Sequence, residues 1–244
     1  MGKVIMSGIV PLLKAPVTDI QAGTLAVGSV VKLMEGGSAV EYIVVNQGKP
    51  SGSSLYDDSC DGTWLLRKDI HSSRQWHTSD VNKYETSAIN TWLNGTFFNS
   101  LGDVERAEIK QVKIPYRKNG GPGGTDQSGA NGLSAKIFLL SVYELGWTTG
   151  DNQYFPVNGA KLAYFESGTG TSANNKRIAN YGGSAASWWL RSPRTNYTSS
   201  AWCVDTNGIY RGNYASYSGG VRPALVLPKT ALFDEATLLL KGAA

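Results

Sequence analysis

Short apolar runs separated by polar, glycine-rich stretches are the dominant pattern along this chain. Residues 27–33 and 41–45 are predicted to be two strands joined by the turn Glu35-Gly36-Gly37-Ser38. Further strand-like runs follow at residues 64–66, 112–116, 136–141, 202–204 and 221–227. None of these runs is long enough to indicate an extended helix. The pattern therefore predicts a domain built mainly from short strands.

Apolar residues at helical spacing occur in only two places. Residues 86–101 have this spacing through Ile89, Trp92, Leu93, Phe97 and Phe98. Gly95 weakens this helix without excluding it. Residues 103–109 are predicted to be a second short helix, with Asp103 available as its N-cap. Strands with few helices and long connections predict an α+β fold and not a parallel α/β sheet.

Two long segments carry no regular apolar pattern. Residues 118–133 are rich in Gly, Asn, Ser and Asp, so we expect only loop there, with Gly120–Gly124 as a flexible part. Residues 148–187 are predicted to be irregular and are longer than an ordinary connection between elements. Connections of this length in a compact domain are usually functional or mobile.

The composition is that of a protein with a substantial core. The chain has 244 residues, of which 41% are apolar and 17% charged, so we expect one domain over residues 27–244. Residues 1–26 are predicted to be an N-terminal arm for docking or oligomerisation. The net charge of +4 includes no basic run longer than a pair, which argues against a nucleic-acid partner. Interrupted apolar runs predict neither a signal peptide nor membrane insertion.

Motifs for catalysis or metal binding are weak. Asp57–Gly62 resembles the first half of a calcium loop, but the twelfth position is Lys68 and not Glu, so a polar turn is expected. His71 and His77 have no neighbouring Cys or patterned carboxylate, and Cys60 and Cys203 match neither a zinc spacing nor a disulfide framework. No nucleophile elbow or catalytic carboxylate pair is present. We therefore expect a non-enzyme without cofactor or metal, with both cysteines buried or half-buried.

The composition of residues 194–219 is unusual. This segment contains four tyrosines and many Asn, Ser and Gly residues, but no Lys, Glu, Gln or Met. Tyrosine provides large, rigid contact area and the small polar residues provide adaptable hydrogen bonds, as in binding loops. An ordinary polar hairpin is the alternative. Five flanking residues are expected to serve the core: Trp188, Trp189, Arg191, Arg222 and Pro223.

The sequence around this segment resembles a known family. Trp188-Trp189-Leu190-Arg191-Ser192-Pro193, a Tyr/Asn/Ser-rich insert and Gly220-Val221-Arg222-Pro223-Ala224-Leu225-Val226-Leu227 are similar to the variable proteins of diversity-generating retroelements. Residues 1–33, 64–68 and 90–95 resemble phage-encoded members, so the likeness covers most of the chain. It implies a C-type-lectin-type fold of the formylglycine-generating-enzyme branch. It also implies a C-terminal region whose adenine-templated codons are rewritten by an error-prone reverse transcriptase.

This resemblance implies which positions vary. Mutation of the adenines in an asparagine codon yields Tyr, Ser, Asp, Gly, Arg and Ile among others, but never Lys, Glu, Gln, Met or Trp. The variable, ligand-binding positions implied by this rule are Arg194, Asn196, Tyr197, Ser199, Ser200, Asp205, Ile209, Tyr210, Arg211, Gly212, Asn213, Tyr214, Ser216, Tyr217 and Gly219. Trp202, Cys203, Val204 and Gly208 would be the fixed scaffold between them.

The function implied by the resemblance is binding of a host receptor from the tip of a phage tail fibre. Its partners would be a host cell-surface protein or glycan and other tail components of the virion, with a homo-oligomer such as a trimer as the expected assembly. The alternatives are a bacterial surface or interaction module of the same fold and a formylglycine-generating-type enzyme. That enzyme branch uses two closely spaced cysteines, whereas Cys60 and Cys203 lie far apart. Signatures of calcium-dependent sugar binding, such as Glu-Pro-Asn, are also missing.

Overall fold

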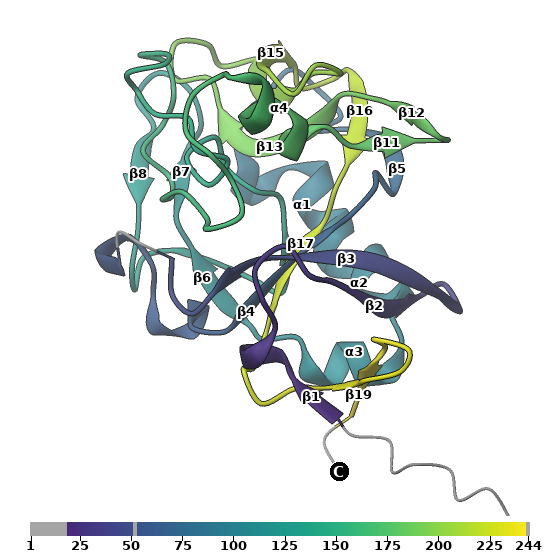
Figure 1. The fold of residues 1–244 in the computed structure, drawn as a ribbon. Helices are drawn as coiled ribbons and strands as arrows, with labels where there is room; N and C mark the ends of the chain where they lie inside the picture. Colours follow the sequence, from purple (N-terminus) through teal and green to yellow (C-terminus); the bar gives the residue numbers. More distant parts are fainter. Residues whose placement is uncertain (1–18, 51–52, 243–244) are drawn as a thin grey trace, which may run out of the picture.

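The computed structural model describes residues 19–50 and 53–242, in which two five-stranded sheets contain most of the residues in strands (Figure 1). The lower sheet of Figure 1 has the strand order β10-β17-β4-β3-β2, and the upper sheet has the order β15-β14-β13-β16-β5. The strands of the lower sheet are β2 (Val30–Glu35), β3 (Ser38–Gln47), β4 (Thr63–Arg67), β10 (Ile137–Phe138) and β17 (Ala224–Leu227). Those of the upper sheet are β5 (Ser72–Gln75), β13 (Trp188–Pro193), β14 (Ser200–Val204), β15 (Tyr210–Tyr214) and β16 (Ser218–Val221).

Smaller elements surround these two sheets. The remaining strands are β1 (Asp19–Gln21), β6 (Val112–Ile114), β7 (Tyr116–Lys118), β8 (Thr125–Gln127), β9 (Leu133–Ala135), β11 (Asn180–Tyr181), β12 (Ser184–Ala185), β18 (Leu232–Asp234) and β19 (Leu240–Lys241). The helices are α1 (Ala88–Trp92), α2 (Phe98–Ser100), α3 (Asp103–Glu108) and α4 (Thr171–Arg177). Short helices packed beside a predominantly stranded structure confirm the predicted α+β class.

The predicted hairpin and helices are present, with corrections at their ends. In the hairpin β2–β3, Gly36 and Gly37 form the turn with φ of 57° and 81°, a conformation that favours glycine. Helix α1 continues through a π-helical turn, Leu93–Phe97, into α2, so residues 88–100 form one helical run. Asp103 was expected to be the N-cap of the next helix, but Gly102 occupies that position and Asp103 is the first residue of α3.

The two segments expected to be irregular contain regular structure. Residues 118–133 include β8, which pairs with β7, and residues 148–187 include α4 and the hairpin β11–β12. These elements were missed because their residues are mostly exposed and lack an alternating or helical apolar pattern.

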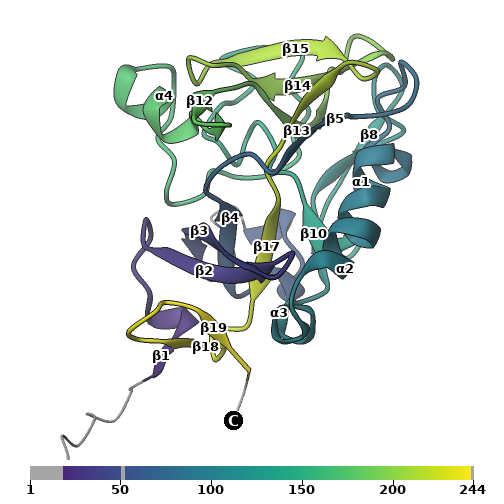
Figure 2. The same cartoon turned by 90° about the vertical axis from the view of Figure 1, so that its right-hand side faces the viewer.

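Residues 19–26, assigned to the N-terminal arm from the sequence, pack onto the domain. Strand β1 pairs with β18, and Ala22 is fully buried, with its N–H donating to the carbonyl of Ala231 at 2.8 Å. The rest of the expected arm, residues 1–18, lies outside the described residues. Strand β1 lies at the opposite end of the molecule from β14 and β15 (Figure 2). Within the described residues, no helix is long and apolar enough to cross a membrane.

The chain passes directly from the upper to the lower sheet between β16 and β17. In this link Arg222 is buried, donates from Nε to the carbonyl of Arg67 at 2.8 Å and lies over the ring of Trp188. Burial lowers the pKa of Arg222 to about 10. The expectation that Trp188, Trp189, Arg191, Arg222 and Pro223 serve the core is confirmed, since all five are buried.

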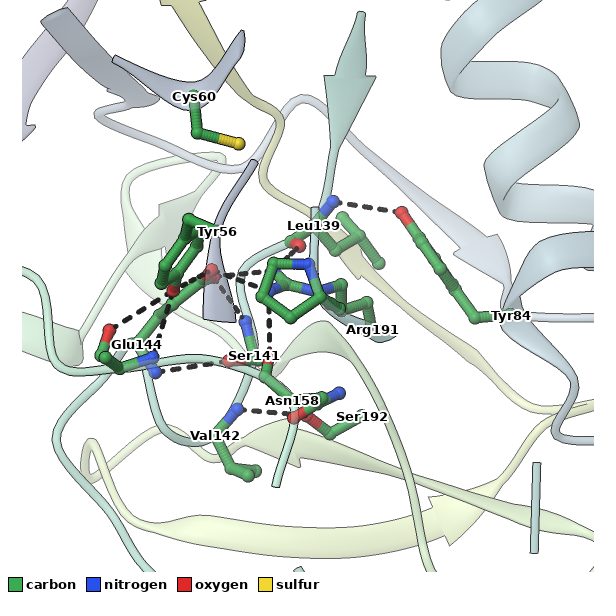
Figure 3. Close-up of polar contacts among 12 residues, drawn as sticks. Tyr56, Cys60, Tyr84, Leu139, Ser141, Val142, Glu144, Asn158, Arg191 and Ser192 are labelled. Atoms are coloured by element: carbon green, nitrogen blue, oxygen red, sulfur yellow. Dashed lines mark hydrogen bonds and ion pairs between the residues drawn. The ribbon is translucent and has the colours of Figure 1, made fainter. Parts of the chain in front are cut away.

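Arg191 is the centre of the polar network that holds β13 in place (Figure 3). Its side chain is fully buried and forms a bidentate ion pair with Glu144, with N–O distances of 2.5 and 2.6 Å. The remaining N–H groups donate to the carbonyls of Pro115, Leu139 and Asn158, so all five donors are used. Burial opposes the charge of Arg191, but the attraction of Glu144 raises its pKa.

Glu144 is equally well satisfied. It accepts hydrogen bonds from the hydroxyl of Tyr56 and the N–H of Ser141, both at 2.9 Å. Burial and the adjacent carboxylate raise the pKa of Tyr56 well above its ordinary value, so the phenol keeps the proton that it donates. The network therefore ties β13 to four segments that are distant in sequence.

Substitution of Arg191 tests this role. We expect Arg191→Met to lower the free energy of unfolding by about 3–5 kcal/mol, because it leaves the Glu144 carboxylate buried without its partner. Adding Glu144→Leu should restore part of the loss. The control Lys68→Met breaks an exposed ion pair with Glu41 and should cost less than about 1 kcal/mol. Urea denaturation measures all three; equal losses for Arg191→Met and Lys68→Met would contradict the assigned role.

Candidate functional site

The β14–β15 hairpin forms the outer edge of the upper sheet and carries most of the predicted binding positions. All five residues of β14 are buried, including Trp202, Cys203 and Val204 of the expected scaffold. Gly208, in the turn between the strands, has a φ of 75°, and a Cβ there would lie 2.1 Å from the carbonyl oxygen of Asn174 in α4. A residue with a side chain does not fit at this position, as expected for a residue of the fixed scaffold.

The loop of residues 194–199 is held through its backbone by Asn82. This buried side chain places its Nδ2 within 2.7–3.2 Å of the carbonyl oxygens of Arg194, Tyr197 and Ser200. The backbone N–H of Asn82 also donates to the carbonyl of Thr198 at 2.9 Å. Asn82 was not predicted from the sequence, because an isolated asparagine far from the segment gives no local signal.

The glycine-rich segment Gly120–Gly124 supports the same loop. A Cβ on Gly121 would lie 2.0 Å from the carbonyl oxygen of Tyr197, and its N–H donates to Asn82 Oδ1 at 2.9 Å. The expectation of a flexible part was therefore wrong for Gly120 and Gly121. They are glycines because two backbones meet there with no space for a side chain.

A hollow of about 410 Å³ lies between this loop and β15. Every residue that lines it belongs to the predicted binding set: Arg194, Tyr197, Ser200, Arg211, Gly212, Asn213, Tyr214 and Tyr217. The three tyrosines of the hollow, Tyr197, Tyr214 and Tyr217, are exposed to 50%, 49% and 56%. The fold thus brings residues from both ends of the segment into one surface, which we call the tyrosine hollow.

The guanidinium of Arg194 lies between two aromatic rings at one side of the hollow. Its Cζ atom is 4.6 Å from the centroid of the Tyr197 ring and 5.1 Å from that of Trp202. Gly212 allows this position, because a Cβ there would lie 2.7 Å from Arg194 Cδ.

The remaining predicted positions lie outside the hollow. Tyr210 packs edge to face against Trp147, Phe155 and Trp202 and donates from its hydroxyl to the carbonyl of Asp151. Asp205 accepts the N–H groups of Asn207 and Ile209 and so closes the hairpin turn. The other five, which are partly buried, are Asn196, Ser199, Ile209, Ser216 and Gly219.

Groups for nucleophilic or metal chemistry are not gathered at this surface. Cys60 and Cys203 are both buried and free, and burial raises their pKa to about 11 and about 12. Their thiols therefore stay protonated at neutral pH. Within residues 19–50 and 53–242, no group of three or more His, Cys, Asp or Glu side chains could hold a metal ion.

Fold and surface together define an α+β domain that displays a tyrosine-lined hollow at the end of a sheet. The chain belongs to the family described as "Domain of unknown function (DUF6273)", which matches residues 61–229. The match extends across β4 to β17 and so includes the Arg191–Glu144 pair and the tyrosine hollow. Comparison with curated proteins and with solved structures gave no match.

Gly219 provides a test of how far the predicted positions can vary. A Cβ there would lie 2.7 Å from Nε1 of Trp189, whose buried indole donates to the carbonyl of Arg74. We expect Gly219→Ala to lower the free energy of unfolding by about 1–3 kcal/mol through overpacking. The exposed neighbour Ser218→Ala should change it by less than about 0.5 kcal/mol. Thermal and urea unfolding measure both, and a neutral Gly219→Ala would show that Trp189 can move.

Proposed function

We propose that this protein is a ligand-binding protein whose tyrosine hollow is diversified by a retroelement. One observation carries the proposal: all eight residues lining the hollow come from the segment whose composition fits mutated asparagine codons. The residues beneath it are of a different kind. Residues 201–204 of β14 are buried and include a tryptophan that such codons cannot produce, and the side-chain amide of Asn82 binds carbonyl oxygens of the loop.

The loop anchors explain how such a surface could vary without loss of the fold. The carbonyls of Arg194, Tyr197 and Ser200 are bound by Asn82, and the N–H of Thr195 donates to the carbonyl of Tyr154. None of these bonds uses a side chain at a predicted variable position. Substitution of Arg194, Tyr197 or Ser200 would change the displayed side chain and leave these backbone bonds in place.

The resemblance to variable proteins extends the proposal to a C-type-lectin-type fold of the formylglycine-generating-enzyme branch. Short strands, few helices and long connections are compatible with that fold. Phage-encoded relatives suggest a receptor-binding protein at a tail-fibre tip of the virion. The position of the lining residues supports this arrangement, since β14 and β15 lie at the far end of the domain from β1, leaving that end for attachment or oligomerisation (Figure 2).

A bacterial surface or interaction module of the same fold is the second candidate, because the geometry of the hollow serves it equally well. Diversification distinguishes the two. An enzyme of the formylglycine-generating type has less support, because its cysteine pair has no counterpart in Cys60 and Cys203, which are buried and separate.

Deep sequencing of the gene in a natural population tests diversification directly. We expect substitutions concentrated at adenine-derived positions of the predicted variable codons, and unchanged codons for Trp202, Cys203 and Val204. An imperfect repeat of the 3′ coding region should lie beside a reverse transcriptase gene. Codons that mostly end in A or G at the variable positions, or substitutions spread evenly over the gene, would contradict the proposal.

Tyrosine substitutions test whether the hollow is separable from the fold. Tyr197→Ala, Tyr214→Ala and Tyr217→Ala should each change the free energy of unfolding by less than about 1 kcal/mol, because these rings are largely exposed. Tyr210→Ala is the matched comparison and should cost about 2 kcal/mol or more, because it removes the ring packed against Trp147 and Phe155. Urea denaturation gives the values. Similar losses for all four would show that the hollow is structural.

A further inference from the structure

We infer that the tyrosine hollow of this protein binds an acidic glycan through a carboxylated sugar residue. The inference rests on the proposed ligand-binding function and specifies its ligand class. Two arginines without acidic partners, three exposed tyrosine rings and two small polar side chains line the same hollow. Each of these features matches one part of such a sugar.

Arg194 is the first anion-binding group. Its Nε is buried and has no hydrogen-bond partner among the described residues, and no carboxylate pairs with its guanidinium there. Stacking between Tyr197 and Trp202 holds the planar group in position without using its N–H donors. The other N–H groups of this guanidinium also have no hydrogen-bond partner among the described residues, and a carboxylate in the hollow matches their forked geometry best.

Arg211 is the second such group. It is exposed on β15, and within the described part of the chain its side chain has no ion pair or hydrogen bond. No Asp or Glu lines the hollow, so the two positive charges are not neutralised by the surface itself. Most other arginines are paired or buried in the fold, as Arg67 is with Glu35 and Arg117 with Asp126. The charge of the hollow is therefore available to a ligand.

The rest of the lining favours a sugar over an acidic peptide. The volume of about 410 Å³ falls within the range of small-molecule sites, roughly 300–1,000 Å³. Exposed tyrosine rings pack against the apolar C–H face of a sugar ring, and Ser200 and Asn213 can hydrogen-bond its hydroxyls. An extended acidic peptide would need a longer strip of cations than two arginines provide.

Three probes with the same sugar ring test the inference by ligand-observed NMR titration: methyl glucuronide, methyl glucoside and a phosphorylated glucose. A glutamate-rich peptide is the fourth probe. We expect methyl glucuronide to bind at least tenfold more tightly than methyl glucoside. Arg194→Gln and Arg211→Gln should each weaken this binding about tenfold or more, since a charge-assisted hydrogen bond is lost. Lys118→Gln removes an equal charge at an exposed position outside the hollow and should leave binding unchanged.

Each other outcome has a defined meaning. Equal binding of glucuronide and glucoside, or binding insensitive to both arginine substitutions, overturns the inference while ligand binding stands. Tighter binding of the phosphorylated sugar would identify a phosphate ligand instead of a carboxylate. Binding of the peptide alone would identify an acidic protein. Either result overturns the inference of a carboxylated sugar. No binding of any probe also overturns it. Diversification of the gene is measured by sequencing, so failure of the proposed function can be distinguished from failure of the inference about the ligand.

Discussion

The buried pair of Arg191 and Glu144 is the interaction on which the arrangement of this domain depends. Two charges removed from water are costly unless their hydrogen bonds are complete. Here they are complete, because every N–H of Arg191 has an acceptor and each oxygen of Glu144 accepts twice. These bonds join segments that are distant in sequence. The pair thus fixes β13, the middle strand of the upper sheet, against residues 139–144 and 158.

The tyrosine hollow depends on this placement through the order of the sheet. Strand β14 pairs with β13 and β15 pairs with β14, so the hairpin that carries the hollow is positioned by a strand that contributes nothing to it. Asn82 then fixes the adjoining loop through carbonyl oxygens. The strands beneath the hollow are buried, whereas the tyrosines that line it are half-exposed. Large aromatic side chains can then remain exposed without weakening the fold.

The sequence predicted those parts of the fold that have a local signal. The β2–β3 hairpin follows from two apolar runs joined by a turn that contains Gly36-Gly37, and the helical run 88–100 follows from the spacing of Ile89, Leu93 and Phe97. Composition alone indicated the segment that lines the hollow. Strands β5 and β8 were not predicted, since their residues are polar and carry no alternating apolar pattern; β5 pairs with the distant β16, and β8 pairs with the preceding strand β7. Asn82 and the close approach of Gly121 to Tyr197 are long-range contacts of the same kind.

The two ends of the β14–β15 hairpin differ in how freely their side chains can change. At the hollow, Arg211, Tyr214 and Tyr217 face solvent and contact little of the core. At the other end, Tyr210 packs against Trp147 and Phe155, and the turn closed by Asp205 lies against α4. A change at Tyr210 would therefore disturb the long connection that contains these aromatic residues. If the same mutational process acted on both ends of the hairpin, substitutions at the turn end would prevent folding more often, and fewer of those variants would be retained. Ligand specificity would then be concentrated in the tyrosine hollow, where a substitution alters the surface but not its support.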